Sequence, residues 1–154
     1  MEENQSIERT YYTSRFFHGV DDKRRVQIPA KWRPAKAGIQ LTLVVWLKPK
    51  EGPALRVMPP EKMAKLVRDI EAMQNDDPEK AVLKRIVGSE SAQVTLDKVG
   101  RITIPEEMAQ VAGLDKEAVL VGVLDAYEIW NPERYAKMRS ADAVMAQEAF
   151  KRME

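Results

Sequence analysis

Two short segments of this chain place an aspartate four residues before an arginine, a spacing that could serve anion binding. The first segment contains Asp21 and Arg25, and the second contains Asp97 and Arg101. A short aspartate side chain commonly accepts hydrogen bonds from nearby backbone N–H groups and fixes a tight turn. The arginine can pair with that aspartate, or it can project outward to bind phosphate or read guanine edges. Spacing alone favours the simpler interpretation, a turn stabilised by an exposed ion pair.

Both segments belong to a pattern that the chain carries twice. Residues 20–29 read VDDKRRVQIP, and residues 96–105, which lie 76 positions further on, read LDKVGRITIP. A second echo relates LRVMPPE (55–61) to YEIWNPE (127–133). Two copies of a long period predict a pseudo-symmetric pair of units, because solenoids generally need three or more repeats. Duplication supports DNA binding only in part, since a duplicated fold also duplicates its structural turns.

The composition of the 154-residue chain argues against several kinds of site. There is no cysteine and only one histidine, His18, which disfavours thiol chemistry, metal centres and a His-centred catalytic triad. No nucleophile–base pair or Gly-rich phosphate loop is evident, so we expect neither an enzyme nor a cofactor nor a small-molecule substrate. No apolar run is long enough to span a membrane, and the acidic start does not resemble a secretory signal. We therefore expect a cytoplasmic protein without membrane contact.

Charge is distributed unevenly along the chain. The formal net charge is only +1, but residues 21–36 gather basic side chains at Lys23, Arg24, Arg25, Lys31, Arg33 and Lys36. A local patch sets the field that a partner feels at close range, whatever the net charge. The three tryptophans, Trp32, Trp46 and Trp130, lie on predicted strands or next to proline, so we expect packing contacts from them and not base stacking.

Hydrophobic alternation and turn residues predict the elements that must position the two segments. Each unit is expected to run β-hairpin, short helix, β-hairpin, helix, with residues 97–100 as a hairpin loop in which Gly100 takes a positive φ. Gly113 is expected to cap a helix and Asn131 to begin one. The final helix is expected to break near Ser140. A linker helix after residues 75–78 is expected to turn inward Val82, Leu83, Ile86 and Val87.

These elements divide the chain into five expected segments. They are a polar N-terminal arm (1–10), a first unit (11–74), a linker helix (75–90), a second unit (91–137) and a helical tail (138–154).

Three stretches resemble the MraZ family, bacterial transcriptional regulators of the division and cell-wall gene cluster. HGVDDKRRVQIPAKWR (18–33) resembles the family's first loop, VTLDKVGRITIP (94–105) its other loop, and VLVGVLDAYEIWNPERY (119–135) its closing strands. The resemblance implies an α+β, mainly β fold. It would contain two duplicated double-split (swapped-hairpin) β-barrel units of the AbrB type, with short helices, a linker helix and a helical tail. It also implies a ring-like homo-oligomer, associated with the nucleoid, that binds double-stranded promoter DNA.

Carried over by position, the resemblance assigns DNA contacts to the two loops. The candidates are Lys23, Arg24, Arg25, Lys98 and Arg101, with Asp21 and Asp97 bracing the loops. Arg24 stands where the family has the glycine that Gly100 retains. If Arg24 keeps a left-handed conformation, the cost is about 1 kcal/mol, which an extra phosphate contact could offset. Lys98 lies one place earlier than the family's basic residue and is the weaker candidate.

We therefore predict a sequence-specific DNA-binding regulator that acts as a repressor and binds promoter repeats as a homo-oligomer. The alternative is an AbrB-like antitoxin or protein-interaction module that acts through its helical tail (141–154). A single unit followed by a long disordered tail is usual for that antitoxin fold, whereas this chain has two units and a short amphipathic end.

Overall fold

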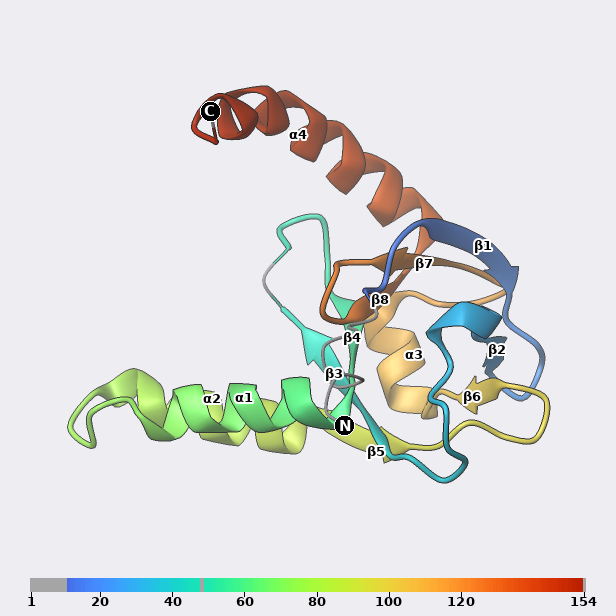
Figure 1. Ribbon diagram of the computed structural model, residues 1–154, viewed down its shortest axis with the longest axis horizontal. Helices are drawn as coiled ribbons and strands as arrows, with labels where there is room; N and C mark the ends of the chain where they lie inside the picture. The colour runs from blue at the N-terminus through green and yellow to red at the C-terminus, as the bar shows by residue number, and fades with distance from the viewer. Residues whose placement is uncertain (1–10, 48, 154) are drawn as a thin grey trace, which may run out of the picture.

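The computed structural model describes residues 11–47 and 49–153 as an α+β fold built mainly from antiparallel sheet (Figure 1). This confirms the broad class that the sequence predicts, α+β and mainly β. The predicted N-terminal arm, residues 1–10, lies outside the described residues. The strands are β1 (Arg15–Gly19), β2 (Arg25–Gln27), β3 (Leu41–Trp46), β4 (Ala54–Met58), β5 (Ser91–Val94), β6 (Arg101–Thr103), β7 (Glu117–Gly122) and β8 (Tyr127–Trp130). The α-helices are α1 (Pro60–Glu71), α2 (Pro78–Ser89), α3 (Glu106–Ala112) and α4 (Pro132–Lys151).

The order of elements repeats along the chain, as the sequence echo predicts. The first half runs β1, β2, a 3₁₀ turn (Ala30–Trp32), β3, β4 and α1. After α2, the second half runs β5, β6, α3, β7, β8 and α4. Helix boundaries follow the predicted signals: Gly113 caps α3 at φ 69°, and the Asn131 side chain accepts the Arg134 N–H at the start of α4.

Strands from the two halves interleave. The six-stranded sheet has the order β1-β7-β8-β4-β3-β5, and β2 and β6 form a separate two-stranded ribbon. The hairpins β3–β4 and β7–β8 form as expected. A local hairpin around residues 97–100 is wrong, because β5 pairs with β3 whereas β6 pairs with β2. Alternation of apolar and polar residues specifies which face of a strand is buried. It does not specify which other strand pairs with it, so the hairpin could not be deduced from the pattern.

The main core lies between the sheet, the ribbon and α3. Fully buried side chains of the ribbon strands and of the residues that follow them meet side chains of the sheet: Val26, Ile28, Ile102 and Ile104 on one side, and Leu43, Leu55, Leu120 and Ile129 on the other. Trp32 enters the same core at 2% exposure, and Trp130 is buried under α4 on the opposite face of the sheet. The two tryptophans therefore pack as predicted.

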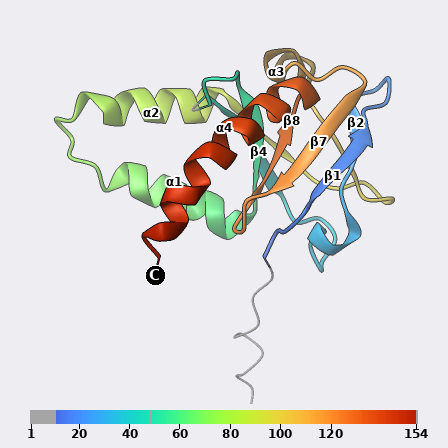
Figure 2. The same cartoon turned by 90° about the horizontal axis from the view of Figure 1, so that it is seen from above.

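Two helical parts extend away from this body. The α1–α2 hairpin reaches out on the side opposite the ribbon, and α4 runs from the sheet into solvent (Figures 1 and 2). The inward placement of the α2 apolar residues is wrong: Val82, Leu83 and Ile86 are 46%, 38% and 36% exposed, and Val87 is only half-buried. A projecting pair of helices can cover only one face of each helix. The break near Ser140 is also absent, since α4 is continuous from Pro132 to Lys151.

Among the described residues, no helix combines the length and the apolar character needed to cross a membrane.

Candidate nucleic-acid interface

The first loop, residues 21–25 (loop 1), is built around the carboxylate of Asp21. Its Oδ1 accepts hydrogen bonds from the backbone N–H groups of Lys23 at 3.0 Å and Arg25 at 2.7 Å. Its Oδ2 accepts one from Nε of Arg25 at 2.7 Å. The Arg24 N–H closes the turn on the Asp21 carbonyl at 2.9 Å. The Asp21 carboxylate thus holds both the backbone of the loop and the guanidinium of Arg25.

The second loop, residues 97–101 (loop 2), repeats this arrangement bond for bond. Oδ1 of Asp97 accepts the N–H groups of Val99 at 3.1 Å and Arg101 at 2.9 Å, and Oδ2 accepts Nε of Arg101 at 2.9 Å. The Gly100 N–H closes the turn on the Asp97 carbonyl at 3.0 Å. The spacing of four residues therefore codes for the same braced turn in both halves.

The loops lower the pKa of both aspartate carboxyls because their hydrogen bonds stabilise the charged form. The hydrogen bond from the Arg25 N–H is the main cause that lowers the pKa of the Asp21 carboxyl, and the Arg25 guanidinium lowers this pKa further. The Arg101 N–H and guanidinium lower the pKa of Asp97 in the same way.

The β2–β6 ribbon presents the two arginines on one face. Val26 and Ile102 point into the core at 0% exposure, so their neighbours on each strand point outward. Arg25 lies opposite Thr103, and Gln27 lies opposite Arg101. At about 3.4 Å per residue, this register offsets the two arginines by about 7 Å along the ribbon. The arginine side chains are 30% and 31% exposed.

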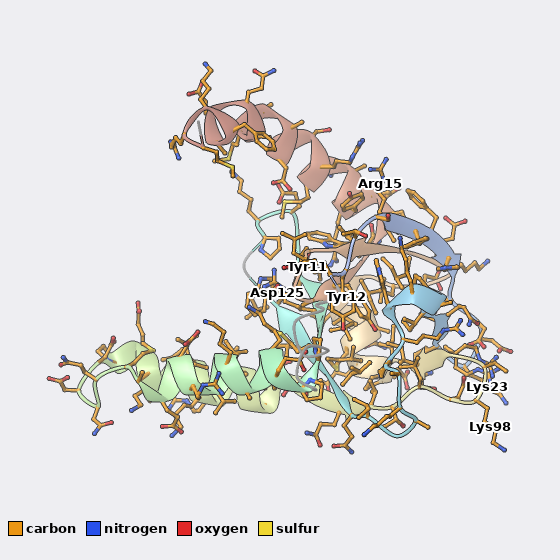
Figure 3. All side chains as sticks on the ribbon, viewed as in Figure 1. Tyr11, Tyr12, Arg15, Lys23, Lys98 and Asp125 are labelled. Atoms are coloured by element: carbon orange, nitrogen blue, oxygen red, sulfur yellow. The ribbon has the colours of Figure 1, made fainter. Side chains whose placement is uncertain are left out.

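Further hydrogen bonds tie each loop to the other strand. The Gln27 amide donates to the Val99 carbonyl at 2.6 Å, and the Ile28 N–H donates to the Gly100 carbonyl at 2.9 Å. On the other side, the Ile104 N–H donates to the Arg24 carbonyl at 2.9 Å. The two loops are therefore held as one rigid surface. Lys23 and Lys98 extend from it at the end of the molecule away from the α1–α2 hairpin (Figure 3).

Arg24 adopts the left-handed conformation expected from its place in the repeat. Its φ is 62°, against 87° for Gly100. Its Nε donates to the Ile104 carbonyl at 2.9 Å, which links loop 1 to the end of the strand that follows loop 2. A hydrogen bond from a side chain to a backbone carbonyl contributes about 1 kcal/mol, similar to the cost of the left-handed conformation.

Arg33 also lies at this surface, although the sequence placed it only in the basic cluster of residues 21–36 and not among the candidate site residues. Its Nε donates to the Ile28 carbonyl at 2.9 Å, and its guanidinium lies where a Cβ of Gly100 would be. Ile28 and Ile104 occupy the same place in the sequence repeat. An arginine therefore binds the equivalent carbonyl in both halves, from Arg33 in one and Arg24 in the other. Gly100 was the one feature of the sequence that could have indicated this role of Arg33, because a glycine leaves room for a side chain from another segment.

Comparisons with known proteins agree with the loop sequences. The chain is 35% identical over 125 residues to a protein of Thermomicrobium roseum named "Transcriptional regulator MraZ", an alignment that covers 81% of this chain and 84% of that protein. The chain belongs to the MraZ family. A protein of the same name from Leuconostoc mesenteroides is 30% identical with the same coverage, and one from Rickettsia canadensis is 26% identical over 89% of this chain and 92% of that protein.

The model of this family, described as "MraZ protein, putative antitoxin-like", matches residues 89–153, which include loop 2 and α4. The MraZ relatives carry the names of regulators and not of enzymes. Within residues 11–47 and 49–153, no three His, Cys, Asp or Glu side chains form a group that could hold a metal ion.

The structure brings all the predicted site residues into this one surface. Arg25 and Arg101 are braced and point outward, and Lys23 and Lys98 are exposed at the loop tips. Arg24 differs from Arg25 and Arg101 in its partner, because its Nε donates to the backbone carbonyl of Ile104 and not to the aspartate of its own loop.

Proposed function

We propose that this protein is a sequence-specific DNA-binding transcriptional regulator, with the β2–β6 ribbon and its two loops as the DNA-reading surface. The proposed operator consists of promoter repeats upstream of a division and cell-wall gene cluster, and the proposed effect is repression. The names of the MraZ relatives support regulation of transcription.

The observation that carries this proposal is the pair of outward-facing, aspartate-braced arginines on a two-stranded ribbon. The major groove of B-DNA admits a two-stranded antiparallel ribbon, and arginine binds the O6 and N7 atoms of guanine with two hydrogen bonds. The braces occupy Nε of Arg25 and Arg101. Within the described part of the chain, their Nη groups make no hydrogen bond, so both remain available for a base edge. A pre-ordered arginine loses little side-chain entropy on binding.

The lysines have a different role in this mechanism. Lys23 and Lys98 are exposed, and their flexible ammonium groups suit the phosphate backbone more than a base edge. Neutralising phosphates releases counterions, so affinity should fall as salt rises, with a log–log slope of about −0.9 for each phosphate contact. Base reading by the arginines and phosphate binding by the lysines are thus separable by experiment.

We further propose that each half, residues 11–74 and 91–137, is a swapped-hairpin, AbrB-like unit of a double-split barrel. The pairing of β1 with β7 and of β3 with β5 supports this assignment, because each half contributes strands to the other. Residues 75–90 and 138–154 are then a linker helix and a helical tail outside the two units.

Self-association is part of the proposal. The outer half of α4 exposes Val144, Met145 and Phe150 at 76%, 71% and 68%, and Met153, just after the helix, is 79% exposed. Large apolar side chains that are each exposed to this extent gain from burial against another molecule. In a closed homo-oligomer, several ribbons would bind successive DNA repeats at once, which converts weak contacts into avidity.

The test is a mobility-shift titration on DNA upstream of the protein's own gene, with Arg25→Ala and Arg101→Ala variants. We expect each substitution to weaken operator binding by roughly 5- to 150-fold, since a bidentate arginine–guanine pair discriminates by about 1–3 kcal/mol. Arg85→Ala in α2, far from the ribbon, is the matched control and should bind normally. Oligomer mass, measured by light scattering, should be the same in all four proteins.

Operator binding that survives both loop substitutions would remove the ribbon from the DNA interface. Binding by the wild type that is no stronger for operator than for random DNA would refute sequence specificity. A reporter gene fused to the operator separates repression from activation: deletion of the protein should raise expression if it represses.

A second candidate function is a protein-interaction module that acts through the helical tail (141–154), as an antitoxin would. The exposed apolar side chains of α4 favour it. Its test is recovery of a stoichiometric protein partner with the wild type and its loss with Phe150→Asp, while operator binding stays absent.

A further inference from the structure

A basic hollow lies beside loop 2 and outside the Asp-x-x-x-Arg motif. Its volume is about 260 Å³, and its lining includes Arg33, Lys36, Gly38, Leu96, Lys98 and Gly100. Arg33 and Lys36 come from the segment after the first half of the ribbon, and Lys98 comes from loop 2, 62 positions beyond Lys36 in the sequence. The sequence places Lys36 in the basic cluster of residues 21–36 but gives it no role in binding.

The positive charges of Arg33, Lys36 and Lys98 are not neutralised by the acidic residue that lines the hollow. Asp97 also lines it, but both oxygens of that carboxylate are engaged by Val99 and Arg101 of its own loop. Arg33 is held in place by its hydrogen bond to the Ile28 carbonyl, with its guanidinium over Gly100. Lys36 and Lys98 are exposed, so their ammonium groups are free to move onto an anion. One fixed and two mobile cations suit a phosphate group, which can accept hydrogen bonds from all three.

Loop 1 has different neighbours. The chain beside it is residues 115–117: the Val20 N–H donates to the Lys116 carbonyl at 2.8 Å, and Gly19 pairs with Glu117 in the sheet. That segment offers one lysine between Asp115 and Glu117, and loop 1 itself carries the additional acid Asp22. The surroundings of loop 1 are therefore close to neutral, whereas those of loop 2 are basic.

We propose that the hollow lined by Arg33, Lys36 and Lys98 binds a backbone phosphate of the DNA that loop 2 reads, which makes loop 2 the stronger anchor of the two. This inference rests on the proposed DNA-binding function and adds a phosphate site and its residues to it. Lys36 is the residue to change, because it is exposed and makes no hydrogen bond within the described residues, so its loss leaves the fold intact.

The experiment compares Lys36→Gln with Lys116→Gln, a matched loss of one exposed lysine beside loop 1. Binding is titrated on operator and on random-sequence DNA over a series of salt concentrations. We expect Lys36→Gln to weaken binding to both DNAs by the same factor, roughly three- to tenfold, and to reduce the magnitude of the log–log salt slope by about 0.9. Lys116→Gln should leave affinity and slope close to those of the wild type.

The possible results separate this inference from the proposed function. Wild-type protein that binds no DNA overturns both. Wild-type binding that requires Arg101, together with an unchanged salt slope in Lys36→Gln, overturns only the phosphate site. Equal losses of DNA affinity in Lys36→Gln and Lys116→Gln overturn the inference that loop 2 is the stronger anchor. A hollow that takes up inorganic phosphate in a Lys36-dependent manner, while DNA binding is unaffected by Lys36→Gln, is a small-anion site instead.

Discussion

Loops 1 and 2 have the same aspartate brace but place an arginine against the neighbouring backbone in different ways. In loop 1 the guanidinium belongs to the loop itself, because Arg24 takes the left-handed position and donates to the Ile104 carbonyl. In loop 2 that position is Gly100, and Arg33 from another segment occupies the space and donates to the Ile28 carbonyl. Both halves therefore keep a hydrogen bond from an arginine to the isoleucine carbonyl, but the arginine comes from a different place in the chain in each half.

The same comparison explains why an arginine is tolerated at a position that favours glycine. The left-handed conformation costs about 1 kcal/mol for a residue with a Cβ, and the hydrogen bond to Ile104 returns about as much. Ala109 stands at the repeat position that Arg33 occupies in the first half, so the second half has no arginine there and Arg24 supplies the donor from loop 1 itself. Arg24 is thus a structural residue through its Nε, whatever its outer nitrogens contact.

Making loop 2 resemble loop 1 should have the largest effect. Gly100→Arg would place a side chain against the Arg33 guanidinium at a positive φ, so we expect a loss of about 2–4 kcal/mol in the free energy of unfolding. Urea denaturation at fixed protein concentration measures it. Adding Arg33→Ala removes the obstruction and recreates the Arg24–Ala109 arrangement, so the double variant should recover most of the loss. A double variant no more stable than Gly100→Arg would show that the arrangement is not exchangeable.

Substitutions at Arg24 should have intermediate effects. Arg24→Ala keeps the left-handed conformation but loses the donor to Ile104, so we expect it to destabilise the protein by about 1–2 kcal/mol. Arg24→Gly loses the same donor but relieves the backbone, and should lie within about 1 kcal/mol of the wild type. Urea denaturation distinguishes the two. If both variants matched the wild type, the bond to Ile104 would contribute nothing to stability.

The two aspartates should titrate alike. Both carboxyls have a lowered pKa, so each contributes to the stability of the folded protein at pH values above the ordinary pKa of 3.8. This contribution is lost as the pH falls through the lower pKa of the folded state. NMR titration of the side-chain carboxyls should place both below 3.8. In Arg25→Ala the backbone N–H remains, so the pKa of Asp21 should rise only partway, while that of Asp97 stays unchanged. A full return of Asp21 to its ordinary pKa would assign the brace to the guanidinium.

The smallest effect is expected at Asp22, an acid that loop 2 lacks. Asp22→Asn removes one exposed negative charge from loop 1, which is worth up to about 1 kcal/mol and should tighten DNA binding by roughly two- to fivefold at low salt. The mobility-shift titration measures it, with Asp76→Asn in the α1–α2 connection as the control. Weaker binding in Asp22→Asn would indicate that Asp22 orders loop 1.

Local features of this chain were readable from its sequence. The Asp-x-x-x-Arg spacing predicts the turns, Gly113 and Asn131 predict the ends of two helices, and the alternation around Val26 and Ile102 predicts their buried face. These features depend on backbone geometry and side-chain period over a few residues, so neighbouring positions are sufficient to specify them.

Other features required contacts between distant residues. The apolar face of α2 suggested burial, but a helix pair that projects from the body has no partner for Val82 and Ile86 among the described residues. The loop at 97–100 suggested a local hairpin, but its two strands join different sheets. In both cases the sequence marks a surface as apolar or a strand as alternating, and leaves open which part of the chain lies against it.

The sequence by itself determined the duplicated order of elements, the two braced turns and the membership of a family. Only the tertiary structure decided that β2 pairs with β6, which places Arg25 and Arg101 on one face, and that Arg33 and Lys36 lie beside Lys98. The physical reason is the range of the interactions: a turn is closed by hydrogen bonds within five residues. The ribbon and the basic hollow, in contrast, form when the buried faces of both halves share one core.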